Sequence, residues 1–142
     1  KKYDNLWIKF ENMNNVIKEL NIAFIRLNSI NFTYPFPFML KDQNGKIIMV
    51  NEEWVRTNSI SREEAIGKTD YDLYPTERSE HFKKSDSIVI NSMLGFVVEK
   101  DLNEPNTIII KWEVQGVIKE DKFIAVISVP AQTLINQCQN KI

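Results

Sequence analysis

Cysteine, histidine and glycine are all scarce in this chain of 142 residues. The single cysteine, Cys138, excludes an internal disulfide and fits a reducing, cytoplasmic compartment. The single histidine, His81, excludes a histidine-based metal cluster or catalytic triad. The four glycines form no glycine-rich phosphate loop. We therefore expect a protein that binds or regulates, with no metal and no enzymatic activity of its own.

Long apolar runs and an excess of one charge are also missing. No run approaches the ~20 apolar residues of a membrane span, and no signal peptide is visible. The net charge of −1 leaves no basic footprint for direct nucleic acid binding. Because 43% of the residues are hydrophobic, the chain can fill one core, and we expect one soluble domain. It begins Lys1-Lys2 without methionine, so we expect a fragment or a processed product.

The first thirty residues carry a heptad pattern typical of one long amphipathic helix. Apolar residues recur at alternating steps of four and three: Leu6, Phe10, Met13, Ile17, Leu20, Phe24 and Leu27. Such a helix can pair with its copy in a homodimer, with an interface of Leu6, Phe10, Met13, Ile17 and Leu20. It can equally cover the sheet of its own domain. The sequence leaves both interpretations open.

A hairpin and a series of short helices follow. The turn Asp42-Gln43-Asn44-Gly45 separates two strand-like segments, residues 36–41 and 46–51. Asn51 is a helix cap for residues 52–58, and Ser61 starts a second short helix that Gly67 ends. In the next capped turn, residues 69–75, helix capping explains Asp70 and Asp72 better than acid–base catalysis does.

The rest of the chain predicts a long helix over residues 77–93 and strands over residues 96–102, 107–118 and 123–129. Two strands, a helical insert and three more strands indicate an α+β fold with a five-stranded antiparallel sheet.

This order of residues resembles the PAS family of sensory domains from bacterial signalling proteins. The resemblance rests on the turn Lys41-Asp42-x-x-Gly45, on Asn51, on Ser61-x-Glu63-Glu64-x-Ile66-Gly67-Lys68 and on Asp70-Tyr71-Asp72-Leu73-Tyr74-Pro75. It covers residues 35–130 and implies that residues 131–142 are a tail or the start of a signalling helix.

The resemblance implies a domain that binds a small polar molecule and relays a signal to an attached or partner effector. The effector would be a histidine kinase of a two-component system, a transcription regulator or a cyclic-nucleotide enzyme. The alternative is a ligand-free module for dimerisation or protein interaction.

Strand parity sorts the residues of the sheet into two faces. One face is predicted to carry Phe38, Leu40, Ile48, Val50, Trp112, Val114, Ile124 and Val126. The other carries Met39, Lys41, Ile47, Met49, Glu113, Gln115, Phe123, Ala125 and Ile127. The resemblance implies that the second face meets the helical insert and lines a pocket, which Trp54 and Ile66 help to close.

The ligand-binding residues predicted in this way are Met39, Lys41, Ile47, Met49, Trp54, Ile66, Glu113, Gln115 and Phe123. A buried polar group costs a few kcal/mol unless it finds a partner. Lys41 and Glu113 therefore either pair with each other or read a polar or charged ligand. Trp54 either touches the ligand or simply packs in the core.

The resemblance also bears on cofactors. Haem-binding PAS domains place an axial histidine near the start of the long helix, where His81 stands, but a solvent-facing histidine is the favoured interpretation. The light-sensing flavin branch places a reactive cysteine just after the Ile66-Gly67-Lys68 segment. Asp70 stands at that position, which excludes a photochemical adduct there. The identity of any ligand remains open.

Overall fold

The computed structural model describes residues 5–6, 8–9, 11–16, 18–20, 35–91, 95–118 and 120–139. Within these residues, the strands are β1 (Phe38–Asp42), β2 (Ile47–Val50), β3 (Phe96–Lys100), β4 (Thr107–Gln115) and β5 (Lys122–Pro130). The helices are α2 (Glu52–Asn58), α3 (Arg62–Ala65), α4 (Asp70–Leu73), α5 (Thr76–Asn91) and α6 (Ala131–Gln139). The predicted α+β fold, a five-stranded antiparallel sheet with a helical insert after the second strand, is confirmed.

The strand order is β2-β1-β5-β4-β3, so the first and last strands of the chain lie side by side at the centre of the sheet. Lys41 of β1 faces Ile124 of β5, which in turn faces Glu113 of β4. Strand β5 therefore separates β1 from β4.

Local hydrogen bonds fix where the helical insert begins. The Asn51 side-chain oxygen accepts hydrogen bonds from the backbone N–H groups of Trp54 (2.9 Å) and Phe38 (3.0 Å), and its Nδ2 donates to the Phe36 carbonyl (2.8 Å). Asn51 thus caps α2, as predicted, and also ties that helix to β1.

The end of α3 is tied to β2 in a similar way. The Gly67 N–H donates to the Ile47 carbonyl, and the Ile47 N–H donates to the Lys68 carbonyl, both at 2.8 Å. This close exchange needs the left-handed backbone of Gly67, whose φ of +85° favours glycine.

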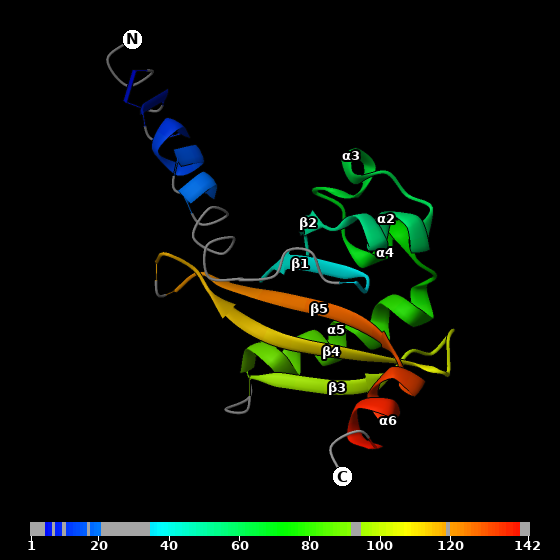
Figure 1. Cartoon of the computed structure of the whole chain (residues 1–142). Coiled ribbons are helices and arrows are strands. Elements are labelled where there is room, and N and C mark those ends of the chain that lie inside the picture. The colour runs from blue at the N-terminus through cyan, green and yellow to red at the C-terminus, as the bar shows by residue number, and fades with distance from the viewer. Residues whose placement is uncertain are drawn as a thin grey trace.

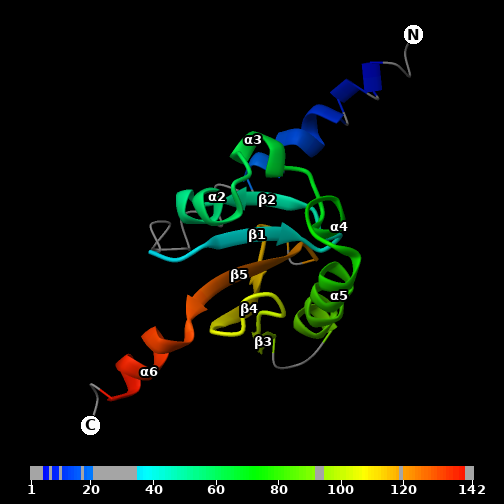
Figure 2. The same ribbon diagram turned by 90° about the vertical axis from the view of Figure 1, so that its right-hand side faces the viewer.

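Helix α5 lies along one face of the sheet, and α2, α3 and α4 lie beside the β1–β2 end (Figure 1; Figure 2). The core on this helix side contains Met39, Ile47, Val50, Trp54, Ala65, Phe82, Val89, Ile109, Ile124 and Val126. A second core, on the opposite face of the sheet, contains Phe38, Leu40, Met49, Phe123 and Ala125.

The described helical residues between 5 and 20 lie on the opposite side of the domain from α6 (Figure 1; Figure 2). The described residues between 5 and 20 are helical, and Leu6, Met13 and Leu20 are 58%, 62% and 53% exposed. Phe10 and Ile17, which complete the predicted interface, lie outside the described residues, as do Phe24 and Leu27. In the part of the chain that the structure describes, no helix combines the length and apolar character needed to cross a membrane.

Candidate functional site

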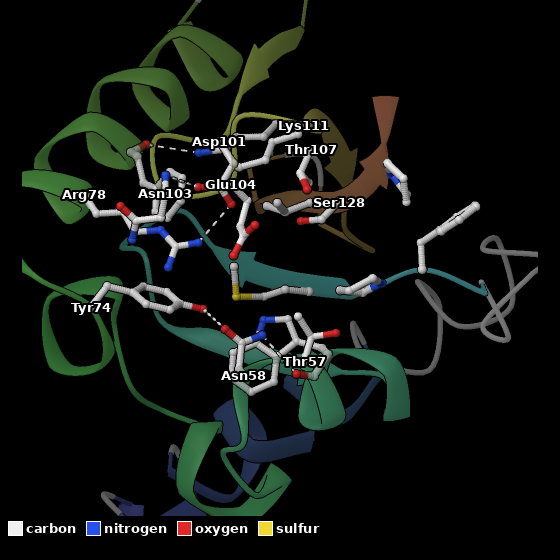
Figure 3. Close-up of a pocket in the computed structure, with 18 of the residues that line it drawn as sticks. Thr57, Asn58, Tyr74, Arg78, Asp101, Asn103, Glu104, Thr107, Lys111 and Ser128 are labelled. Carbon is white, nitrogen blue, oxygen red and sulfur yellow. Dashed lines mark hydrogen bonds and ion pairs between the residues drawn. The ribbon is translucent and has the colours of Figure 1, made fainter. Parts of the chain in front are cut away.

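A cavity of about 570 Å³ lies between the helix-side face of the sheet, helices α2 and α5, and the loop from Asp101 to Thr107. Its walls include Met39, Trp54, Phe82, Ile109 and Val126, which are apolar and buried. Its polar lining includes Thr57, Asn58, Asn103, Glu104, Thr107 and Ser128 (Figure 3). This volume and this mixture are typical of pockets that hold small molecules, which measure ~300–1,000 Å³.

Lys41 stands in the wall of the cavity with its side chain fully buried. Its Nζ lies 2.7 Å from Asp70 Oδ2 of α4 and 2.5 Å from Asp86 Oδ2 of α5. A lysine of β1 therefore joins two helices of the insert through buried ion pairs.

Lys111 of β4 is a second buried cation in the same wall. Its Nζ lies 2.8 Å from Asp86 Oδ1, 2.7 Å from Ser85 Oγ and 3.3 Å from the Phe82 carbonyl oxygen. Asp86 therefore gives one carboxylate oxygen to each lysine and binds α5 to both β1 and β4. Glu99 Oε1 of β3 lies 3.6 Å from Lys111 Nζ and extends the network.

Burial and charge act differently on the two lysines. Burial lowers the pKa of Lys41, but attraction to Asp70 and Asp86 outweighs burial, and the net pKa lies above its ordinary value. Burial lowers the pKa of Lys111, repulsion from Lys41 lowers it further, and Asp86 compensates only in part. The surrounding carboxylates therefore stabilise the charged form of Lys41 more strongly than that of Lys111.

Arg78 of α5 closes one end of the cavity. Its Nη2 lies 3.0 Å from Asp101 Oδ2, and its guanidinium carbon lies 4.5 Å from the centre of the Tyr74 ring. The Tyr74 hydroxyl donates to Asn58 Oδ1 at 3.0 Å, and burial raises the pKa of Tyr74 to about 12. Helices α2 and α5 and the 101–107 loop are thus joined across this end of the cavity (Figure 3).

Of the nine predicted site residues, Met39, Lys41 and Trp54 line the cavity. Trp54 is also a member of the helix-side core, so it fits both of its predicted roles. The other six lie elsewhere: Ile47, Met49, Ile66, Glu113, Gln115 and Phe123. Ile47 packs in the helix-side core, whereas Ile66 and Gln115 are exposed.

The placement of Met49 was wrong because β2 contains an irregularity. Lys41 pairs with Ile47, but the preceding residue of β1, Leu40, pairs with Met49 and not with Ile48. Ile48 is therefore an extra residue, and a bulge of this kind reverses the alternation of side chains beyond it. Met49 consequently lies in the core on the opposite face, and Val50, predicted for that face, lies on the helix side.

The face predicted for each side chain of β5 was wrong. Ile124 and Val126 belong to the helix-side core, whereas Phe123 and Ala125 belong to the core on the opposite face. The strand is buried on both faces, so its sequence has no polar alternation from which to choose an orientation.

The predicted pair of Lys41 and Glu113 does not form. Both residues lie on the helix-side face, but β5 runs between their strands, and strands are spaced ~4.8 Å apart. Glu113 Oε1 lies 3.7 Å from Lys122 Nζ instead, and Lys41 is held by Asp70 and Asp86.

Two further predictions need correction. His81 does not simply face solvent: its Nε2 lies 3.1 Å from Glu99 Oε2, and its side chain is 36% exposed. Asp70 is no helix cap but the buried partner of Lys41, whereas Asp72 does accept from the Thr69 N–H at 2.9 Å. Over the residues that the structure describes, no cluster of histidine, cysteine and carboxylate side chains is able to hold a metal ion.

The sequence interpretation missed Lys111, Arg78, Asp101 and Glu104. The strand alternation that places Glu113 on the helix side also places Lys111 there, and Arg78 lies one turn before Phe82 on α5. Lys111 and Arg78 could therefore have been predicted from the sequence. Asp101 and Glu104 belong to a loop, where no periodicity indicates which side chains point inward.

Comparison with solved structures identifies the fold. The PAS domain of Bordetella pertussis BvgS superposes with a TM-score of 0.61 at 16% identity, covering 84% of this chain and 96% of that one. A PAS domain from Colwellia psychrerythraea gives 0.55 at 18% identity, covering 77% and 96%. Phage VqmA, in a complex with DPO, gives 0.62 at 17% identity, covering 88% of this chain and 61% of VqmA.

No family model and no curated protein matches this sequence. The TM-scores of 0.55 to 0.62 nevertheless show that this chain shares the fold of these structures. The chain has the PAS fold.

Proposed function

We propose that this chain is a sensory or regulatory domain that binds a small molecule in the cavity and relays a signal to an attached or separate effector. The observation that carries the proposal is a cavity of about 570 Å³ that is lined by apolar side chains and a few polar ones. Phage VqmA, a protein of similar fold, has been solved as a complex with DPO.

The cavity has a short structural path to the C-terminal helix. Pro130, the last residue of β5, lines the cavity, and α6 begins at the next residue, Ala131. The Ala131 N–H donates to the Asn106 carbonyl at 2.7 Å, so the loop over the cavity contacts the first turn of α6. A ligand that favours one position of this loop would shift α6 as well.

Filling the cavity tests this proposal. Ser128 points into the cavity from β5 (Figure 3), so the change Ser128→Trp should occupy the space and weaken ligand binding by at least ~10-fold. Native mass spectrometry of the purified chain reports a retained ligand, and a thermal-shift screen of small acids, amines and amino acids finds added ones.

Val98→Trp is the matched control, because Val98 is 58% exposed on β3, outside the cavity. It should retain ligand as the wild type does. A wild-type protein that retains nothing and responds to no compound in the screen would contradict the proposal.

The exposed N-terminal helix favours a second, compatible role in dimerisation. Leu6, Met13 and Leu20 stand on one helical face, and each is more than half exposed. Burying a Leu or Met side chain contributes ~1.5–3 kcal/mol, so this face gains stability when a second copy covers it.

The double change Met13→Glu and Leu20→Glu should therefore convert a dimer into a monomer, as measured by light scattering. Asn12→Glu and Asn15→Glu add the same charge off the heptad seam and should leave the dimer intact. A dimer that survives the first pair of changes would place the interface elsewhere.

A further inference from the structure

Glu104 is the one cavity-lining carboxylate for which the described residues provide no partner. Glu104 is an exposed residue of the 101–107 loop whose side chain points into the cavity (Figure 3), and no hydrogen bond or ion pair joins its carboxylate to any described residue. Asp101, the other lining carboxylate, already accepts from Arg78 and from the Asn103 N–H.

The loop holds Glu104 in this position through its own hydrogen bonds. The Thr107 N–H donates to the Glu104 carbonyl at 2.8 Å, and the Asp101 N–H donates to the Thr107 carbonyl at 3.0 Å. The ion pair from Asp101 to Arg78 anchors the start of the loop to α5. The carboxylate is thus presented to the cavity by a turn that is closed at both ends.

The charged groups around the cavity do not favour an anionic ligand. Lys41, Lys111 and Arg78 are each paired with carboxylates of the protein. These three cations are paired with four carboxylates, Asp70, Asp86, Glu99 and Asp101. Glu104 adds a further negative charge, so the cavity attracts a positively charged ligand.

We propose that the ligand of this cavity is an organic amine whose protonated nitrogen binds the Glu104 carboxylate while its apolar part packs on Met39 and Trp54. The inference rests on the proposed function of this site as a small-molecule pocket. Hydrogen bonds between charged groups are stronger than neutral ones, and an apolar floor beneath the carboxylate supplies the remaining affinity.

The same geometry would make the amine a signal. The loop that presents Glu104 is hydrogen-bonded through Asn106 to Ala131, the first residue of α6. A cation held by Glu104 therefore acts on the segment that touches the base of the C-terminal helix.

Three compounds of nearly equal size test the inference: 2-phenylethylamine, 2-phenylethanol and phenylacetate, each titrated by calorimetry into the full chain. We expect the amine to bind at least ~10-fold more tightly than the alcohol, with the acid weakest, since a charged hydrogen bond contributes about that much. Glu104→Gln should remove the preference for the amine over the alcohol, and added salt should reduce it in the wild type.

Glu120→Gln is the control, because Glu120 is, like Glu104, an exposed acid in a loop but lies outside the cavity, so this change should leave the preference unchanged. An acid or alcohol that binds as tightly as the amine, or an amine preference that survives Glu104→Gln, would overturn the inference. So would the absence of binding by all three compounds. None of these results would by itself contradict the sensor proposal. If the wild type retains a ligand that Ser128→Trp loses, the cavity binds a small molecule of another chemical class.

Discussion

Replacing Asp86 with alanine is expected to lower the free energy of unfolding by about 3–5 kcal/mol, as breaking one side of a buried ion pair typically does. Asp86 gives one oxygen to Lys41 Nζ (2.5 Å) and the other to Lys111 Nζ (2.8 Å), and both lysine side chains are 1% exposed. In the alanine variant, each of the two buried ammonium groups loses one counterion. Urea denaturation monitored by tryptophan fluorescence measures the loss.

A surface pair provides the control. Arg56 Nη1 lies 2.7 Å from Glu53 Oε1, but the Arg56 side chain is 73% exposed. Glu53→Ala should therefore change the free energy of unfolding by no more than ~1 kcal/mol. A loss below ~1 kcal/mol in Asp86→Ala would mean that the lysines find water or other partners, and that the network does not hold α5 to the sheet.

The parts of the fold that the sequence predicted depend on local chemistry. Asn51 caps α2 within three residues of its own position, and Gly67 turns the chain where a left-handed backbone is needed. Such contacts are decided by neighbours in the sequence, so residue type and spacing are enough to find them.

The parts that were mispredicted depend on distant contacts. Helical spacing places Asp86 one turn after Phe82, but it does not indicate a partner such as Lys41, which lies 45 residues away. The bulge at Ile48 and the orientation of β5 follow from pairing across the sheet, which parity within one strand cannot supply. The cavity was therefore predicted on the correct side of β1, but with most of its lining taken from the wrong residues.

The buried charges also explain why the two faces of the sheet were hard to tell apart. A core face usually carries apolar residues, yet Lys41 and Lys111 stand on the helix side with almost no exposure. Their charges are tolerated because Asp70 and Asp86 come from the insert to meet them. The insert is thus held to the sheet by charge as well as by the apolar core.

The double change Lys41→Met and Asp70→Leu is expected to leave stability within ~1 kcal/mol of the wild type, although each single change costs about 3–5 kcal/mol. Lys41→Met leaves the buried Asp70 without its cation, and Asp70→Leu leaves Lys41 with Asp86 alone, a counterion that it shares with Lys111. The double change removes both charges, together with Asp70 Oδ1, a buried oxygen without a hydrogen-bond partner among the described residues. Asp86 keeps Lys111 as its counterion.

Urea denaturation of the four proteins in this double-mutant cycle gives a coupling energy, which should be several kcal/mol. The same cycle at Arg56→Met and Glu53→Leu should give less than ~1 kcal/mol, because that pair is exposed. If the Lys41 and Asp70 losses simply add, the two side chains contribute independently, through packing or other partners. We expect instead that the double variant is about as stable as the wild type, which would mean that the pair is dispensable for folding. A double variant that folds but no longer binds ligand would then show that the buried charges are needed for ligand binding.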